Sequence, residues 1–140
     1  MRPFLTAAPS VILAAFLVFM GIQKFAGNVP IFSIIEANVS DKTGITLAFI
    51  EPFGRYFTGA LEFLAAGLLL TKRFWGGVLA TMVAAGAVAA HLTFLGISTP
   101  ESSASGAAES PVLFYMALGA LALSALVTFL ARPQQAPAQT

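Results

Sequence analysis

The sequence predicts an all-α integral membrane protein, a four-helix bundle that crosses the membrane four times with both termini in the cytoplasm. Three observations predict this fold. Of the 140 residues, 58% are hydrophobic and only 9% are charged, whereas a soluble domain carries about 25% charged residues. Four apolar segments are each long enough to cross a bilayer, which takes about 20 residues in a helix. The basic residues of the short connections share one side of an alternating four-helix arrangement.

The four predicted helices cover about residues 8–25, 52–70, 74–97 and 111–131. The first follows Arg2 and has features of a signal peptide, but its apolar run exceeds the roughly 7–15 residues of such a segment and no clear cleavage site closes it. We therefore expect it to be retained. Pro52 and Pro111 stand where the second and fourth helices are expected to begin, since the missing N–H of proline is harmless there.

The connections between these helices differ in character. Residues 71–73 are short enough for a tight hairpin, and residues 98–110, rich in Ser, Ala, Gly and Glu, predict a polar loop. Residues 28–51 mix apolar and polar side chains, and for their first half we expect a short helix lying on the membrane surface. Residues 132–140, with two prolines and three glutamines, are expected to be disordered. Residues 1–131 are thus predicted to form a single transmembrane domain.

The orientation follows from the distribution of basic residues, which gather on the cytoplasmic side of short loops. Four of them would share the side of the termini, namely Arg2, Lys72, Arg73 and Arg132. The opposite loops carry one lysine, Lys42, among the acidic residues Glu36, Asp41, Glu101 and Glu109. We therefore expect cytoplasmic termini and a first loop that faces outward.

Composition also excludes several classes of function. The net charge of +1 gives no sign of a nucleic-acid partner. The absence of cysteine excludes a disulfide framework, thiolate metal sites and dithiol redox chemistry within the chain. One histidine without cysteine cannot hold a bis-histidine haem or an iron–sulfur cluster, and no nucleophile–base pair, phosphate loop or metal-ligand spacing is present. We expect no metal and no covalently bound cofactor, and whether the chain belongs to an enzyme stays open.

A polar stripe runs along the second predicted helix. Glu51, Arg55, Thr58 and Glu62 follow the spacing i, i+4, i+7 and i+11, so they share one helical face. Charges within a bilayer are costly and call for a partner or a function, so the stripe should face the bundle interior. Glu62 lies about two turns beyond Arg55, roughly 10 Å deeper at a rise of about 1.5 Å per residue, which places it near mid-membrane.

His91, on the third predicted helix, should also point inward. It continues a line of small residues formed by Ala80, Ala84 and Ala87, and small residues let membrane helices approach closely. The first helix adds Gln23 and Lys24 near its outer end. We expect these groups to meet inside the bundle, toward its outer face, as a ligand-binding site or proton relay. The candidate site residues are Gln23, Lys24, Glu51, Arg55, Glu62 and His91.

Each charged candidate also has a purely structural interpretation. Lys24 could extend to the membrane interface as a snorkelling lysine, and Glu51 could simply favour a helix N-terminus. Arg55 could be only an ion-pair partner of Glu51. Glu62 could pair with a neighbouring cation without any further role, and His91 could be a hydrogen-bonded core histidine.

Two stretches of the chain carry motifs in a characteristic order. The first, residues 16–25, ends in Gly21-Ile22-Gln23-Lys24-Phe25. The second, residues 59–70, contains Leu61-Glu62 and ends in Gly67-Leu68-Leu69-Leu70, and it is followed by residues 86–91, which end in Ala87-x-x-x-His91. Together they resemble the DoxX family of four-helix bacterial membrane proteins. The resemblance covers roughly residues 13–97, and the long first loop, Glu51 and Arg55 depart from it.

The resemblance implies a multi-pass protein of the bacterial cytoplasmic (inner) membrane. Carried over by position, the polar residues of the family fall on Lys24, Glu62 and His91. The family takes its name from a subunit of a thiosulfate:quinone oxidoreductase, and its relatives are linked to membrane redox complexes. It therefore implies a quinone as ligand and, besides membrane lipids, a partner subunit or a second copy of the chain as partner.

Three functions are compatible with these features. The first is a subunit that interacts with quinone or serves a membrane redox complex, with electrons supplied by a partner. The second is a structural or assembly subunit whose buried charges dock a helix of a larger membrane complex. The third is a small proton-coupled transporter, since a mid-membrane carboxylate is typical of proton relays, although four helices show no broken-helix pair.

Overall fold

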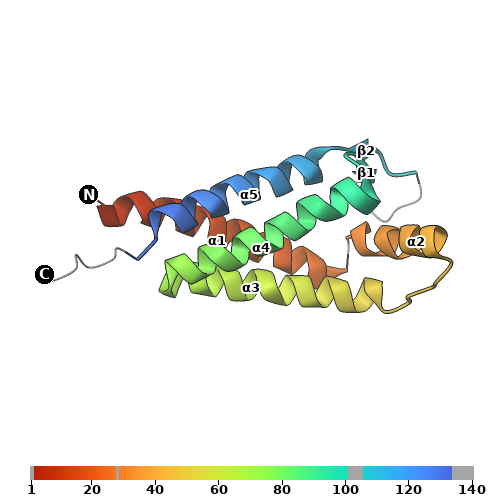
Figure 1. Cartoon of the computed structure of the whole chain (residues 1–140), viewed down its shortest axis with the longest axis horizontal. Coiled ribbons are helices and arrows are strands. Elements are labelled where there is room, and N and C mark those ends of the chain that lie inside the picture. The colour runs from red at the N-terminus through yellow and green to blue at the C-terminus, as the bar shows by residue number, and fades with distance from the viewer. Residues whose placement is uncertain (1, 28, 101–105, 134–140) are drawn as a thin grey trace, which may run out of the picture.

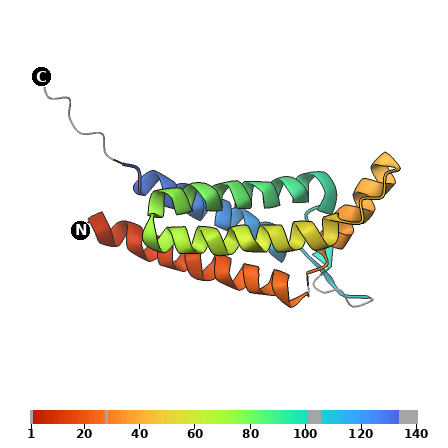
Figure 2. The same cartoon turned by 90° about the horizontal axis from the view of Figure 1, so that it is seen from below.

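The computed structural model describes residues 2–27, 29–100 and 106–133 and shows a mostly helical protein. The five α-helices are α1 (Arg2–Ala26), α2 (Ile31–Thr43), α3 (Arg55–Thr71), α4 (Arg73–Ala90) and α5 (Val112–Leu130). Four long apolar helices pack as a bundle, and α2 lies at one end of it (Figures 1 and 2). The candidate membrane spans are residues 7–26, 50–71, 73–95 and 112–130. The chain is thus a multi-pass membrane protein.

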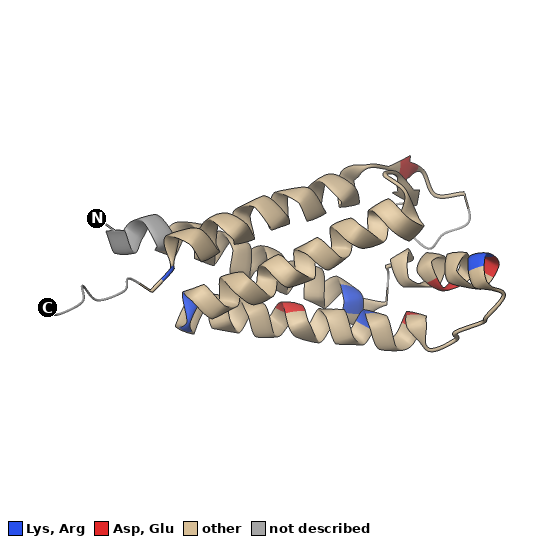
Figure 3. Cartoon of the chain, viewed as in Figure 1, with Lys and Arg blue, Asp and Glu red and all other residues tan. Residues whose placement is uncertain are grey.

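The bundle closes as a ring in which neighbours in space follow a simple order. Helix α1 packs along α3, α3 along α4, α4 along α5, and α5 returns to α1. The beginning of α1, the end of α5 and the α3–α4 turn lie at one end, while α2 lies at the other (Figure 1). Charged segments gather mainly at these two ends, apart from an acidic position midway along α3 and basic positions near it (Figure 3).

The four predicted membrane helices are confirmed, with different ends for the first two. Helix α1 begins at Arg2 rather than near residue 8, because Pro9 lies inside the helix instead of marking its start. The second span begins at Ile50 in a π-helical turn, η1 (Ile50–Gly54), that leads into α3. The prediction that Pro52 is the first helical residue is therefore wrong.

The other two spans also end differently from the prediction. After α4 the chain continues through a second π-helical turn, η2 (His91–Leu95), rather than an α-helix to residue 97. Gly96 ends this turn with a φ of 78°, a positive value that glycine adopts at little cost. Pro111 directly precedes α5 instead of being its first residue.

Apolar side chains and close backbone contacts hold the bundle together. The core consists mainly of Leu13, Leu17, Ala65, Leu69, Ala80 and Val127. At the α3–α4 turn, a Cβ atom on Gly76 would collide with the backbone of Leu68 and Leu69. One on Gly77 would meet the side-chain oxygen and backbone of Thr128 in α5. The two glycines therefore permit the closest helix contacts at the end of the bundle that carries this turn.

The connections at the end of the bundle that carries α2 contain more regular secondary structure than the sequence suggests. The predicted polar loop carries a two-residue antiparallel ladder between β1 (Thr99–Pro100) and β2 (Glu109–Ser110), with Thr99 opposite Ser110. The molecule is therefore mostly helical rather than purely α. Helix α2 confirms the expected short helix in the first long connection, and its place relative to the membrane surface stays a prediction. Of the predicted disordered tail, residues 134–140 lie outside the described residues.

Helix α2 is joined to both π-helical turns. Asn38 donates a hydrogen bond to the carbonyl of Phe94 at 2.6 Å, and Lys42 donates one to the carbonyl of Thr93 at 2.8 Å. Toward η1, the backbone N–H of Glu51 donates to Glu36 Oε2 at 3.2 Å. The helix thus bridges the ends of α3 and α4 that lie away from their connecting turn.

Candidate functional site

A buried ion pair between α1 and α3 forms the centre of the candidate site. Lys24 Nζ lies 2.7 Å from Glu62 Oε1, and the two side chains are 9% and 7% exposed. Both residues reach the interior because they share helical faces with core residues, Lys24 with Leu13 and Leu17, and Glu62 with Leu69. The pairing partner of Glu62, which the sequence left open, is therefore Lys24.

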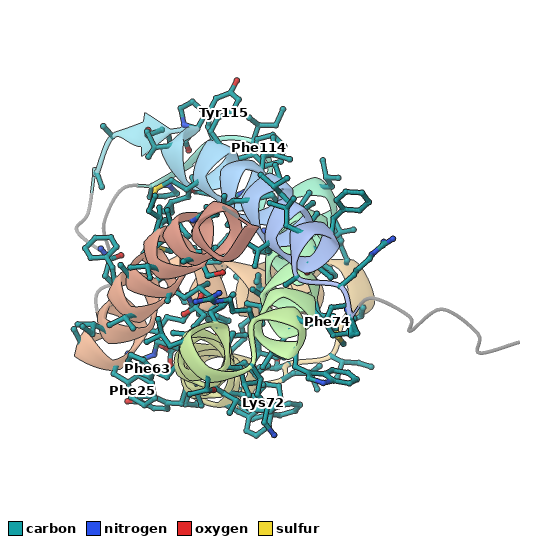
Figure 4. The ribbon with its side chains drawn as sticks, turned by 90° about the vertical axis from the view of Figure 1, so that its left-hand side faces the viewer. Phe25, Phe63, Lys72, Phe74, Phe114 and Tyr115 are labelled. Carbon is teal, nitrogen blue, oxygen red and sulfur yellow. The ribbon has the colours of Figure 1, made fainter. Side chains whose placement is uncertain are left out.

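Two aromatic rings pack across the α1–α3 interface from positions next to Lys24 and Glu62 in the sequence. Phe25 and Phe63 stack with their centroids 5.6 Å apart and lie side by side at the edge of the bundle (Figure 4). Each ring sits over a glycine of the other helix, since a Cβ on Gly59 would lie 2.9 Å from Phe25 and one on Gly21 would lie 3.0 Å from Phe63. The interface of α1 and α3 is thus closely packed at this level of the bundle.

The second carboxylate oxygen of Glu62 is not used by the protein. Within the described part of the chain, Glu62 Oε2 is buried and has no hydrogen-bond partner. A buried acceptor without a partner is costly, by about 1–3 kcal/mol or more for a charged group. Glu62 can therefore accept a hydrogen bond from a bound molecule.

Arg55 forms a second polar group beside the ion pair. Its Nε lies 2.9 Å from Glu51 Oε1, and its Nη1 donates to the backbone carbonyl of Lys24 at 3.3 Å. Its Nη2 donates to the hydroxyl of Tyr56 at 3.3 Å. Arg55 therefore binds a carbonyl in the last turn of α1, where such groups lack helical partners. Glu51 and Arg55 are connected to Lys24 through its backbone rather than through its side chain.

His91 and Gln23 take different positions from the ion pair. His91 is 4% exposed, and its Nδ1 lies 2.8 Å from the carbonyl oxygen of Gly96. Its ring meets Phe114 edge-on at 5.5 Å. Gln23 is half-buried and does not line the cavity described below. The single polar cluster expected from the sequence is thus divided, and His91 shares a cavity with Lys24 and Glu62 without a direct hydrogen bond to either.

That cavity has a volume of about 360 Å³ and lies within the bundle. Its polar lining residues are Lys24, Thr58, Glu62 and His91, and the rest of its wall is apolar. Ile31, Phe32 and Ile35 of α2 close its end, and Met116 of α5 contributes to its side. These residues were not among the candidates predicted from the sequence, although the spacing of Ile31 and Ile35 by one helical turn shows that they share a face.

The cavity combines an apolar wall with few polar groups, as small-molecule sites do. Lys24 carries three N–H donors, one of which is used by Glu62, and Glu62 Oε2 is an acceptor. Among the described residues, no three His, Asp or Glu side chains are grouped to hold a metal ion. The site therefore fits an apolar molecule with a small hydrogen-bonding head group.

Comparison with protein-family models, curated proteins and solved structures finds no match to this chain.

Proposed function

We propose that this chain binds the head group of a membrane quinone in the bundle cavity. In this proposal it is a DoxX-like subunit that serves a membrane redox complex and is not an oxidoreductase by itself. The observation that supports it is the buried pair Lys24–Glu62, which leaves Glu62 Oε2 without a partner at the wall of an apolar cavity.

The energetic cost of this arrangement supports a functional role. Burying two charges costs several kcal/mol per ion, and hydrophobic residues of similar volume are often as stable or more so. Packing alone therefore does not require Lys24 and Glu62. In a quinone site the ammonium group can donate to a ring carbonyl, and the carboxylate can accept from a quinol hydroxyl or exchange a proton with it. A volume of about 360 Å³ lies in the range of ligand pockets, about 300–1,000 Å³.

The proposal includes a partner and an orientation. Electrons would come from a partner subunit, since a chain with one histidine and no cysteine cannot hold a bis-histidine haem or an iron–sulfur cluster. We place the protein in the bacterial inner membrane with cytoplasmic termini, because Lys72, Arg73 and Arg132 lie at the end where α1 begins. The cavity then lies toward the outer face.

Thermal melting in mild detergent tests the proposal. A short-chain quinone or its quinol should raise the melting temperature of the wild-type protein, because a ligand that binds only the folded state stabilises it. Glu62→Gln removes the counter-charge of Lys24 and should lower the melting temperature, but it should stay folded because the amide oxygen can still accept from Lys24. It should lose the ligand-induced shift, because the amide cannot replace the carboxylate as the partner of the head group. Glu51→Gln is the matched control, as Glu51 does not line the cavity, and it should keep the shift.

An assembly subunit is the alternative, and one observation favours it. Lys24 and Glu62 neutralise each other and join α1 to α3, so the pair could serve the bundle alone. No shift of the wild-type melting temperature across a broad series of quinones and quinols would contradict quinone binding. That result, with loss of assembly in Glu62→Gln, would favour the structural role.

A further inference from the structure

The cavity lies in a wedge between α3 and α4. The two helices touch where Gly76 meets Leu69, and in Figure 1 they diverge from that turn toward α2. Glu62 and Thr58 lie on the face of α3 that carries Leu69, since they precede it by 7 and 11 residues. Both line the cavity. Near the turn this face of α3 therefore packs on α4, and closer to α2 the same face lines the cavity.

The same is true of α4. Val83, Ala87 and Ala90 follow Gly76 by 7, 11 and 14 residues, so they share the face that meets α3 at the turn. All three line the cavity, and Ala87 is exposed although Ala80 and Ala84 near it are buried. The cavity wall at Ala87 is thus accessible from the surface of the protein.

The exposed part of the cavity wall lies at membrane depth. Met82 is 67% exposed, and Gly86 is exposed with no atom within 4 Å of the place of its Cβ. Both belong to the span 73–95, and Gly86 is nine residues from its end, roughly 13 Å at about 1.5 Å per residue. At that depth the surroundings of the wedge are lipid chains rather than water.

Two other sides of the cavity are covered. Phe25 and Phe63 close the α1–α3 interface, and Ile31, Phe32 and Ile35 of α2 cover the end of the wedge away from the turn. Hydrogen bonds from Asn38 and Lys42 tie α2 to η2. The side of the wedge that carries Met82 and Gly86 is exposed and forms an open way to Lys24 and Glu62.

We infer that the α3–α4 wedge is a lateral entrance from the bilayer, used by a ligand that carries one hydrogen-bonding head group and a long apolar tail. The head group reaches Glu62 Oε2, and the tail leaves between α3 and α4 past Gly86 into the lipid. The identity of the head group rests on the proposed quinone function, whereas the entrance itself is independent of it. A water-soluble ligand of the same head group would not need this opening.

Spin labelling tests the entrance without any ligand, and the absence of native cysteine makes each introduced cysteine unique. The test position is Ala87→Cys, with Gly119→Cys on the exposed side of α5, Thr46→Cys outside the spans and Ala65→Cys in the core as references. In lipid vesicles, the Ala87 label should collide with dissolved oxygen as the Gly119 label does and remain protected from a water-soluble nickel chelate. Nickel access equal to that at Thr46, or protection from both as at Ala65, would overturn the inference.

Binding of quinols with and without an isoprenoid tail tests the use of the entrance. Gly86→Trp should weaken binding of a tailed quinol about tenfold or more, because the indole ring would occupy the opening and the tail could pass only by displacing packed side chains, and should leave the tail-less quinol little changed. Gly119→Trp is the control, because Gly119 is exposed on α5 and does not line the cavity. Equal loss for both quinols, or no loss for either, would refute the entrance while leaving quinone binding intact. If neither quinol binds the wild type, the proposed quinone function is wrong. The spin-label accessibilities then still test whether the α3–α4 wedge opens to the bilayer.

Discussion

At the scale of single residues, Lys24 and Glu62 should contribute to stability as a pair. Lys24→Met leaves the Glu62 carboxylate buried without its counter-charge, and breaking a buried pair in this way costs about 3–5 kcal/mol. The double variant Lys24→Met/Glu62→Leu removes both charges from an apolar environment and should recover most of that loss. Unfolding of both variants in detergent, compared with the wild type, measures the difference.

The double variant also separates stability from function. It should be nearly as stable as the wild type but lose the melting shift produced by a quinone or quinol, because neither polar group remains. A double variant as unstable as Lys24→Met would show that the charges do more than neutralise each other. Retention of the ligand-induced shift would place the head group elsewhere.

Residue periodicity predicted much of this site but not its connections. The spacing of Glu62 and His91 on their helices placed both in the interior, where they are buried. Periodicity gives the face of a helix but neither the rotamer nor the partner, so it could not separate Lys24 from Arg55 as the partner of Glu62. It also could not show that His91 Nδ1 bonds to the carbonyl of Gly96, because that contact depends on how the helix ends.

At the scale of helices, the close contact at the α3–α4 turn should be sensitive to a single methyl group. Gly76→Ala would place a Cβ against the backbone of Leu68 and Leu69, and such overpacking costs about 1–3 kcal/mol. Gly119→Ala, in open space on α5, should be neutral or slightly stabilising because alanine has the higher helix propensity. Equilibrium unfolding in detergent compares the two, and equal stability would show that the turn relaxes freely.

The sequence predicted the four spans well and the segments around them less well. Long apolar runs identify membrane helices because a bilayer needs about 20 such residues. The π-helical turns at residues 50–54 and 91–95 could not be recognised in the sequence, since one wider turn changes neither the composition nor the length of an apolar segment. The pairing of Thr99 with Ser110 was missed for a related reason, because two-residue strands are too short to show an alternating pattern.

At the scale of the whole molecule, the two ends of the bundle should face opposite sides of the membrane. Cysteines introduced at Lys72, in the α3–α4 turn, and at Thr46, after α2, are exposed and separated by the second span. An impermeant maleimide added to intact cells should label Thr46→Cys, whereas Lys72→Cys should react only after the membrane is opened. The positive-inside distribution sets this direction.

Two outcomes would contradict that arrangement in different ways. Labelling of both positions from the same side would exclude the second span as a membrane crossing. Labelling of Lys72→Cys alone in intact cells would keep the four spans but invert them, and the cavity would then lie toward the cytoplasm.

The bridge that α2 makes between η1 and η2 has a mechanical consequence. The bundle consists of two helix pairs, α1 with α3 and α4 with α5. The pairs are joined at one end by the α3–α4 turn, where Gly76 makes the closest contact. At the other end, hydrogen bonds from α2 to η2 and from η1 to α2 connect the two pairs. Helix α2 is not among the candidate spans. The width of the cavity thus depends on a segment outside the candidate spans. A change in the length of α2 would change the distance between the two helix pairs, and with it the width of the cavity, without any substitution in the spans.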